Sequence, residues 1–167
     1  EPDPEKLSAV AEWPIPKTLT ELRAFVALAS YYRRHVEGFA GIARPLHDLT
    51  RKNQPFVWTE VQQKAFEELK RRLCSYPVLA TPLPEGEYVV DTDASNVALG
   101  AVLQQRQEGK LRVIAYASRV MDPAERNYCT TRKELLGIIY GLRTFRHYLL
   151  GSQFLLRTDH AALTSLL

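Results

Sequence analysis

Three acidic residues occupy positions from which their side chains can meet at one end of a small predicted sheet. Asp93 ends the apolar stretch EYVVDTD and Asp159 ends the apolar stretch FLLRTD. Ligands commonly bind outside the carboxyl ends of strands in such sheets, and two parallel neighbouring strands would bring these carboxylates together. Glu134 stands at the N-terminal end of the apolar stripe of a predicted helix, so its side chain points towards the sheet.

Carboxylates without histidine or cysteine partners are ligands suited to hard cations such as Mg²⁺ or Mn²⁺, and they disfavour zinc. Two such ions, roughly 3.5–4 Å apart, support in-line displacement at phosphorus. The three acids therefore predict phosphodiester cleavage as a hypothesis.

Each acid also has a purely structural interpretation. Glu134 follows Thr131 at the spacing of a capping box, and Asp93 could open a turn through its own side chain. Asp91 shares a strand face with Asp93, and we expect it either to support that residue or to lie at the surface. Taken together the acids are harder to explain in this way, because capping does not require all three to converge.

Other catalytic chemistries find little support in the sequence. His160 follows an aspartate, but neither Ser95 nor Ser118 lies in a G-x-S-x-G context, which argues against an acyl-transfer hydrolase. There is no Walker-type phosphate-binding loop. Cys74 and Cys129 match no metal or redox spacing, and we expect them to be reduced thiols in the core.

The elements that must position the acids lie in the second half of the chain. Three strands with short connections, EYVVDTD, ALGAVLQQ and LRVIAYAS, predict an antiparallel arrangement. A long helix from Thr131 to Leu149 and a further strand, FLLRTD, complete a crossover that implies parallel pairing with an earlier strand. The side chains expected to face the core from this helix are Leu135, Ile138, Ile139, Leu142, Phe145 and Leu149.

The first half of the chain has a helical pattern. Two capping boxes, Thr18 with Glu21 and Thr59 with Gln62, predict two helix starts, and Gly38 is the expected end of the first helix.

Pro45 is expected to break the short apolar segment that lies between the two predicted helices. The cations Lys70, Arg71 and Arg72 end the second helix, where they either compensate the helix dipole or contact phosphate.

Composition restricts the class of protein without identifying it. With 167 residues, 46% of them hydrophobic and 25% charged, the chain is expected to be globular. No apolar run approaches the ~20 residues of a membrane span, and the first residues lack the pattern of a secretory signal, so we expect neither a membrane protein nor a secreted one. A net charge of +3 permits a nucleic-acid partner but does not imply one.

Prolines and a glycine between positions 77 and 86 indicate a boundary between domains at 1–78 and 79–167.

An ordered series of motifs resembles the pol polyprotein of Ty3/gypsy-type LTR retrotransposons. The resemblance covers nearly the whole chain and rests on these stretches: WPIPKTLTELRAFVALASYYRRHVEGFAGIARPLHDLT, FVWTEVQQKAFEELKRRL, VVDTDASNVALGAVLQQ, IAYASR, NYCTTRKELLGIIYGLRTFRHYLLG and FLLRTDHAAL. It implies an α+β fold. Residues 1–78 would be the thumb-like, C-terminal helical region of a reverse transcriptase. Residues 79–167 would be a ribonuclease H-like mixed sheet, truncated at its C-terminus.

The resemblance also implies roles for single residues. The aspartate of TDAS is Asp93, the glutamate of RKELL is Glu134 and the aspartate of TDH is Asp159, and these would be the catalytic acids that hold two Mg²⁺ or Mn²⁺ ions. The implied reaction is hydrolysis of the RNA strand of an RNA·DNA hybrid. The residues expected to contact substrate are Thr131, Arg132, Asn127 and Arg119.

Further expectations concern partners and activity. The resemblance implies that the polymerase fingers and palm precede this segment, so the chain alone is not expected to polymerise DNA. It also implies that a fourth metal-binding acid follows Leu167, so the metal site of the nuclease would be incomplete in this chain. Its partners would be the hybrid, the remaining ribonuclease H, the integrase and, through exposed apolar sheet surface, a second copy of itself. Its location would be intracellular, in cytoplasmic virus-like particles. The alternative is a noncatalytic nucleic-acid-binding or scaffolding module, such as an inactive or host-adopted remnant of a retroelement.

Overall fold

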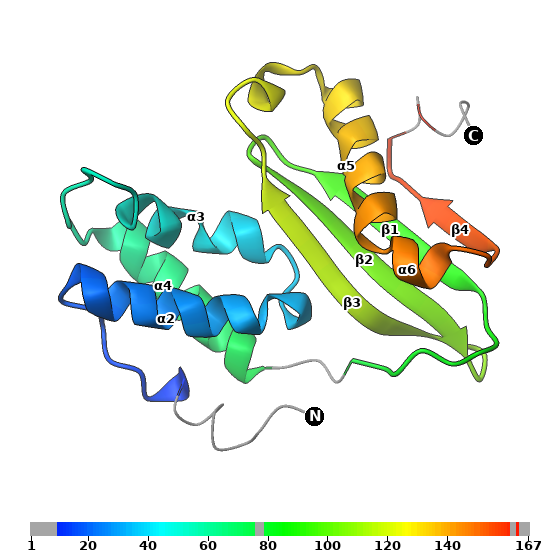
Figure 1. Cartoon of the computed structure of the whole chain (residues 1–167), viewed down its shortest axis with the longest axis horizontal. Helices are drawn as coiled ribbons and strands as arrows, with labels where there is room; N and C mark the ends of the chain where they lie inside the picture. Colours follow the sequence, from blue (N-terminus) through cyan, green and yellow to red (C-terminus); the bar gives the residue numbers. More distant parts are fainter. Residues whose placement is uncertain (1–9, 76–78, 161–162, 164–167) are drawn as a thin grey trace. The chain divides into compact units, whose positions relative to one another are not determined.

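The chain folds as two compact units, Glu1–Val78 and Leu79–Leu167 (Figure 1). The structure is a computed structural model that describes residues 10–75, 79–160 and 163. Within this described part, no helix is long and apolar enough to cross a membrane.

The first unit is helical. Its core contains the fully buried side chains of Leu22, Phe25, Leu46, Phe66 and Leu69, and the rings of Phe25 and Phe66 lie 4.6 Å apart between centroids. The elements are α2 (Leu19–Tyr31), the 3-10 helix η1 (Arg33–His35), α3 (Phe39–Leu49) and α4 (Glu60–Cys74).

Both predicted helix starts are present, but only one has a complete capping box. At α4 the Thr59 hydroxyl accepts from a backbone N–H of the first turn, and the Thr59 amide donates to the Gln62 side chain over 3.0 Å. At α2 the Thr18 hydroxyl accepts from the amide of Glu21 over 3.2 Å. The Glu21 carboxylate does not return the bond, and it accepts instead from the amide of Lys17 over 2.7 Å.

Two predictions about this unit were wrong. The first helix ends at Tyr31 and not at Gly38, which has a left-handed φ of 65° and precedes α3 as its N-cap. Pro45 does not break the next segment but lies inside α3. A proline in a helix interior costs about 3 kcal/mol, and burying large apolar side chains such as Phe39 and Leu46 offsets this because each contributes about 1.5–3 kcal/mol.

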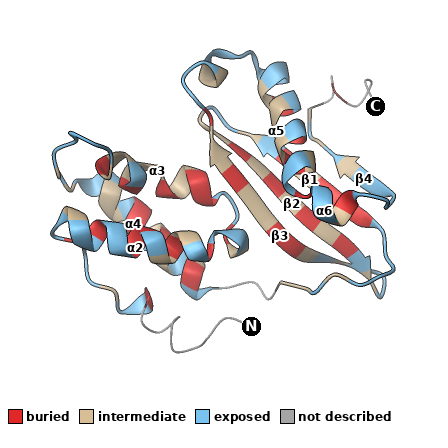
Figure 2. Cartoon of the chain, in the orientation of Figure 1, coloured by how far each residue is buried: buried red, intermediate tan, exposed pale blue. Residues whose placement is uncertain are grey.

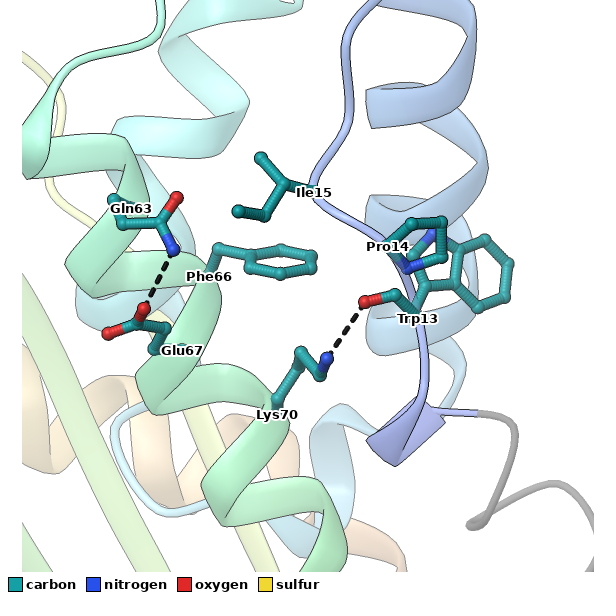
Figure 3. Close-up of a pocket in the computed structure, with 7 residues that line it drawn as sticks. All are labelled: Trp13, Pro14, Ile15, Gln63, Phe66, Glu67 and Lys70. Atoms are coloured by element: carbon teal, nitrogen blue, oxygen red, sulfur yellow. Dashed lines mark hydrogen bonds between the residues drawn. The ribbon is translucent and has the colours of Figure 1, made fainter.

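The cations at the end of α4 make contacts within the unit. The Lys70 ammonium donates to the carbonyl of Trp13 over 2.8 Å, beside a pocket formed by the N-terminal stretch and α4 (Figure 3). Arg71 and Arg72 both pair with Glu68, at 2.6 and 2.7 Å. These contacts favour the structural interpretation of the three cations over phosphate binding.

The second unit is built on a four-stranded mixed sheet, as predicted. The strands lie in the order β3-β2-β1-β4, with antiparallel pairing except between β1 and β4, which are parallel. The strands are β1 (Tyr88–Ala94), β2 (Ala98–Gln107), β3 (Lys110–Val120) and β4 (Phe154–Arg157). The connection from β3 to β4 contains the 3-10 helix η2 (Glu125–Asn127), α5 (Thr130–Thr144) and α6 (Arg146–Leu149). The α+β fold class is confirmed.

Helix α5 packs on one face of this sheet (Figure 1), and Figure 2 marks the buried residues of both. Residues of β1 and β2 that share this face, such as Val90 and Leu103, form a core with Phe145 and Leu149. The predicted single helix is interrupted at Phe145, which separates α5 from the short α6.

The predicted core face of the helical segment is confirmed at Ile138, Phe145 and Leu149, which are buried, and Leu142 packs partly buried against the same core; two predicted positions differ. Leu135 and Ile139, expected in the core, are 44% and 38% exposed. Within α5 the buried residues are Glu134, Gly137, Ile138 and Gly141, so two glycines share the buried face with Ile138. Glycines on this face let the helix approach the sheet closely, because a Cβ added at Gly141 would lie 3.0 Å from the Cβ of Ala101. The prediction was wrong for Leu135 and Ile139 and missed the two glycines because it considered only large apolar side chains.

The prediction that both cysteines lie in the core was also wrong. Cys74, at the end of α4, and Cys129, the residue before α5, are exposed. Both stand at helix ends, where the chain leaves the packed part of its unit.

Candidate metal centre

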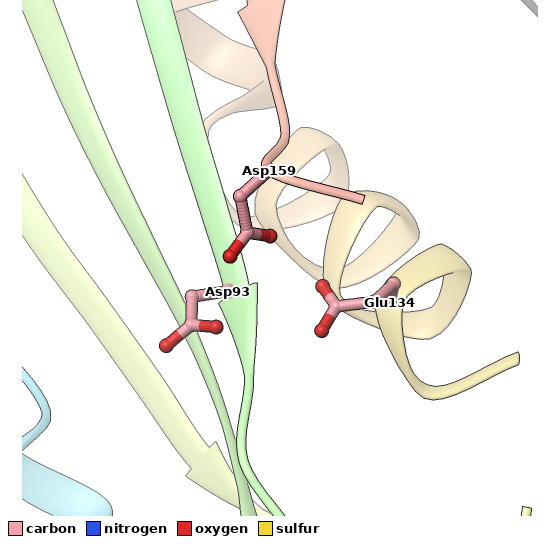
Figure 4. A group of neighbouring side chains, drawn as sticks. All are labelled: Asp93, Glu134 and Asp159. Carbon is pink, nitrogen blue, oxygen red and sulfur yellow. The ribbon is translucent and has the colours of Figure 1, made fainter. Parts of the chain in front are cut away.

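The three predicted acids come together in the second unit. Asp93 is the next-to-last residue of β1, Glu134 lies in the first half of α5, and Asp159 follows β4 by two residues. One carboxylate oxygen from each can be chosen so that all three lie within 4.8 Å of one another. Figure 4 shows the three side chains turned towards a common space.

Two features of the fold produce this convergence. Parallel pairing aligns Asp91 of β1 with Arg157 of β4, so Asp93 and Asp159 each follow a paired residue by two positions. The packing of α5 against β1 brings the third acid, since a Cβ at Gly137 would be in ordinary van der Waals contact with the carbonyl oxygen of Asp93, at 3.5 Å. Glu134 stands just under one turn before that glycine, beside the end of β1.

The structural interpretations of two acids do not hold. The turn after β1 is organised by Ser95, whose hydroxyl accepts from the amides of Val97 and Ala98 over 3.2 and 2.9 Å. Helix α5 begins after Cys129 without a side-chain capping bond, so Glu134 is not part of a capping box. Asp93 and Glu134 are therefore not explained by local turn or helix chemistry.

Glu134 carries the clearest electrostatic signature of a cation site. Its side chain is buried at 5% exposure, whereas Asp93 and Asp159 are exposed. Burial is the main cause that raises the pKa of Glu134, and the negative charges of Asp93 and Asp159 raise it further. Its Oε2 atom is buried and has no hydrogen-bond partner among the described residues. A buried carboxylate oxygen without a donor, next to two more carboxylates, fits a hard divalent cation.

Thr131 and Arg132, two of the residues predicted to contact substrate, lie on the first turn of α5. The Thr131 hydroxyl is 3.0 Å from Nε2 of His160, the residue after Asp159, so it joins the start of the helix to the acidic cluster. Arg132 is exposed, and neither a hydrogen bond nor an ion pair is found for it within the described part of the chain.

Asn127 and Arg119, the other two predicted contacts, take part in local structure. Asn127 lies in η2 and donates to the carbonyl of Pro123 over 3.1 Å. Arg119, in β3, pairs with both carboxylate oxygens of Glu125, at 2.7 and 2.8 Å, and lies 5.6 Å from the ring of Tyr140. The structure does not bring either residue into the acidic cluster.

The sequence reasoning missed two groups of residues that shape the site. One is the pair Gly137 and Gly141, whose spacing of four on a helix could have indicated close packing. The other is Arg157, which precedes Asp159 by two residues, as Asp91 precedes Asp93. The two parallel strands end in the sequences Asp91-x-Asp93 and Arg157-x-Asp159. This match could have suggested an ion pair between Asp91 and Arg157.

This sheet, with its crossover helix and acidic cluster, has the architecture of a ribonuclease H-like domain. Residues 58–156 match the family described as the RNase H-like domain found in reverse transcriptase. The match covers more than half of the chain, and the chain therefore belongs to this family. Asp93 and Glu134 lie within the matched range, and Asp159 follows it by three residues.

Retroelement polyproteins resemble the chain over nearly its whole length. It is 41% identical over 163 residues to the retrovirus-related Pol polyprotein from transposon 297 of Drosophila melanogaster, covering 97% of the chain and 15% of that protein. Identity to the transposon gypsy Pol polyprotein of the same organism is 38%, with coverage of 97% and 16%. For the transposon Tf2-3 polyprotein of Schizosaccharomyces pombe identity is 36%, with coverage of 95% and 12%. The predicted resemblance is confirmed, and the chain spans only 12–16% of the length of these relatives.

Solved structures share the fold. The foamy viral protease-reverse transcriptase in complex with double-stranded DNA superposes with a TM-score of 0.82 at 24% identity, covering 99% of this chain and 35% of that one. The same viral protein in complex with an RNA/DNA hybrid gives a TM-score of 0.80 at 24% identity, with coverage of 98% and 22%.

Proposed function

We propose that this chain is a segment of a retroelement Pol polyprotein whose second unit contributes a metal-dependent ribonuclease H that hydrolyses the RNA strand of an RNA·DNA hybrid. The observation that carries the proposal is the convergence of Asp93, Glu134 and Asp159 within 4.8 Å, with a buried Glu134 oxygen that lacks a donor. The family supports it, as does the viral reverse transcriptase of the same fold that was solved with an RNA/DNA hybrid.

Asp93, Glu134 and Asp159 would together hold two Mg²⁺ or Mn²⁺ ions. When bound, two such metal ions activate water for attack on phosphorus and stabilise the leaving oxygen. Glu134 suits this role because its Oε2 atom is buried and accepts no hydrogen bond from the described residues. A bound cation would supply the favourable interaction that this oxygen lacks. Asp93 and Asp159 are exposed, so the open side of the cluster can admit a phosphodiester.

Substrate contacts are assigned to the start of α5. Thr131 and Arg132 are exposed there, close in sequence to Glu134, and backbone amides at a helix N-terminus favour phosphate. Asn127 and Arg119 are less suited to this role, because each is held in a local contact.

The helical first unit would hold the hybrid by shape and charge without reading its sequence. The remaining parts of the Pol polyprotein, including the polymerase fingers and palm, the rest of the ribonuclease H and the integrase, would be its partners. The setting we propose is the cytoplasmic virus-like particle, and self-association through apolar sheet surface is part of the same proposal.

The proposal is tested by incubating the chain, and the chain extended by its natural continuation, with an RNA·DNA hybrid labelled on the RNA strand. We expect cutting of the RNA strand in Mg²⁺ or Mn²⁺, and none of double-stranded DNA. Asp93→Asn should abolish cutting, whereas Glu85→Gln, an exposed acid of the connecting segment, should not. Undiminished cutting by Asp93→Asn would exclude the acidic cluster as the active site. Hybrid binding without cutting in both chains would favour the noncatalytic module.

A further inference from the structure

We propose that the ion pair between Asp91 and Arg157 sets the register of β4 against β1 and so positions Asp159 in the metal centre. The two side chains are positioning residues and not metal ligands. This inference rests on the proposed function, because it explains how one of the three acids reaches its place.

The contact joins the two strands at the pair nearest to the acids. Asp91 and Arg157 are directly opposite each other in the parallel ladder, and theirs is its last pair. Arg157 binds Asp91 through two bonds, from Nε to Oδ1 at 2.5 Å and from Nη2 to Oδ2 at 2.6 Å. On the other side, Gln104 of β2 donates to Oδ2 of Asp91 over 2.5 Å. Asp91 is therefore held in orientation by β2 while it binds β4.

Little else specifies the register of β4. The strand has four residues and, within the described part of the chain, pairs with β1. Phe154 and Leu155 are 39% and 46% exposed, and Leu156 alone packs against the core of this unit. Register is strongly specified where one face of a strand is buried and weakly where it is not. A two-point ion pair between opposed residues supplies a specificity that burial does not.

The metal centre depends on this register because its carboxylate oxygens must lie close together to share a cation. A slip by one residue would turn Asp159 to the other face of the sheet. A slip by two residues would move it along β1 by about 6.6 Å, at about 3.3 Å per residue. Both displacements are incompatible with carboxylate oxygens that lie within 4.8 Å of one another.

A cross-linking experiment tests the geometry without any metal. The full chain carries Asp93→Cys and Asp159→Cys in a background with Cys74→Ser and Cys129→Ser, and it reacts with a short bis-methanethiosulfonate reagent. We expect rapid cross-linking, and a rate several-fold lower when Arg157→Gln is added. Arg106→Gln is the matched control, because Arg106 forms a similarly exposed pair with Glu87, which directly precedes β1 at its other end. Equal rates with and without Arg157→Gln would overturn the proposal.

Mn²⁺ titration of the full chain, followed by the paramagnetic resonance of the free ion, tests the consequence for the site. Removing a positive charge near a cation site strengthens cation binding if electrostatics alone acts. Loss of positioning weakens it, and supporting residues around metal sites commonly contribute 10- to 100-fold. We expect Arg157→Gln to bind Mn²⁺ roughly 10-fold more weakly than the unmodified chain. Unchanged or tighter binding would contradict the positioning role.

An exchange of the two charged residues distinguishes a positioning role from general destabilisation of the fold. Exchanging the two residues, with Asp91→Arg and Arg157→Asp together, should restore much of the cross-linking rate that either single change lowers. Two results together would overturn the proposal. The exchanged chain would fail to recover its cross-linking rate, and Arg157→Gln and Arg106→Gln would lower the urea midpoint equally. The Asp91–Arg157 pair would then be an ordinary surface contact. If the unmodified chain does not bind Mn²⁺ but its cross-linking depends on Arg157, the metal function fails and the register role stands.

Discussion

Glu134 is the residue at which function and stability conflict. Its carboxylate is buried, has an oxygen without a donor among the described residues, and faces two more negative charges. Such an arrangement costs free energy unless a cation compensates it. The raised pKa of Glu134 expresses the same cost, since the folded chain favours the protonated, neutral form.

We expect Glu134→Gln to stabilise the metal-free chain at pH 7 by about 1 kcal/mol or more, because it removes a buried negative charge that the Ala94 amide and His160 offset only in part. The sign follows from linkage. The pKa of Glu134 is raised in the folded state above its ordinary value of 4.5, so the unmodified chain loses stability as pH rises from that value through the raised pKa. The variant should lack this loss.

Urea unfolding in a chelator, at a series of pH values, measures this effect. Glu85→Gln serves as the control, because that exposed acid lies outside the cluster. A Glu134→Gln chain that is less stable than the unmodified one at pH 7 would show that the carboxylate is satisfied inside the protein.

At the scale of elements, helix α5 must lie close to the sheet for Glu134 to meet Asp93. The two glycines of its buried stripe differ in the space they leave. A Cβ at Gly141 would lie 3.0 Å from the Cβ of Ala101 and 3.1 Å from Cγ2 of Thr92, which is tighter than ordinary contact. At Gly137 the nearest atom would be 3.5 Å away, an ordinary van der Waals distance.

We expect Gly141→Ala to weaken Mn²⁺ binding and to lower stability, and Gly137→Ala to do neither. Overpacking costs typically 1–3 kcal/mol, while replacing glycine by alanine in a helix gains about 1 kcal/mol, so the net cost at Gly141 is about 0–2 kcal/mol. Gly137→Ala receives the gain without the clash. Urea unfolding and Mn²⁺ titration of both variants measure the difference, and equal behaviour would show that the helix adjusts freely.

An ion pair between Arg119 and Glu125 stabilises the connection from β3 to α5. Arg119, near the end of β3, holds both carboxylate oxygens of Glu125 in η2. The hydrogen bonds from Arg119 are the main cause that lowers the pKa of Glu125 to about 2. The pair therefore contributes stability above about pH 4.5 that is lost as the pH falls through about 2.

We expect Glu125→Gln to lower the free energy of unfolding by about 1 kcal/mol at pH 7, and by less as the pH approaches 2. Urea unfolding at pH 7 and pH 3 measures this, with Glu87→Gln as the control on an exposed pair. A loss that stayed constant with pH would assign the effect to packing and not to charge.

At the scale of the whole molecule, the chain consists of two units with separate cores. Asp93, Glu134 and Asp159 all belong to the second unit. The proposed roles are divided accordingly, with metal binding in the second unit and support of the hybrid in the first.

Removing residues 1–78 should therefore leave Mn²⁺ affinity within about threefold, a change below 1 kcal/mol by the affinity scale, while it weakens hybrid binding at least tenfold. Mn²⁺ titration and fluorescence anisotropy with a labelled hybrid measure the two effects on residues 79–167. Loss of Mn²⁺ binding alone would mean that the first unit supports the metal centre. Unchanged hybrid binding would remove its proposed role.

The sequence by itself determined the strands, the crossover and the identity of the three acids. Alternation of apolar residues predicts strands because side chains of a strand point to opposite faces, and the order of strand, helix and strand implies the parallel pair that brings Asp93 and Asp159 to one edge. These are local patterns and a topological rule, and both can be read from the chain.

Only the tertiary structure showed that glycines belong to the buried face of α5, and which residues hold the acids in register. Leu135 and Ile139 gave the stronger apolar signal, yet glycines occupy the interface because closeness to the sheet matters more there than apolar area. The Asp91–Arg157 pair joins residues 66 positions apart, and its value arises only when β4 lies beside β1. Contacts between distant residues depend on packing that no local pattern records.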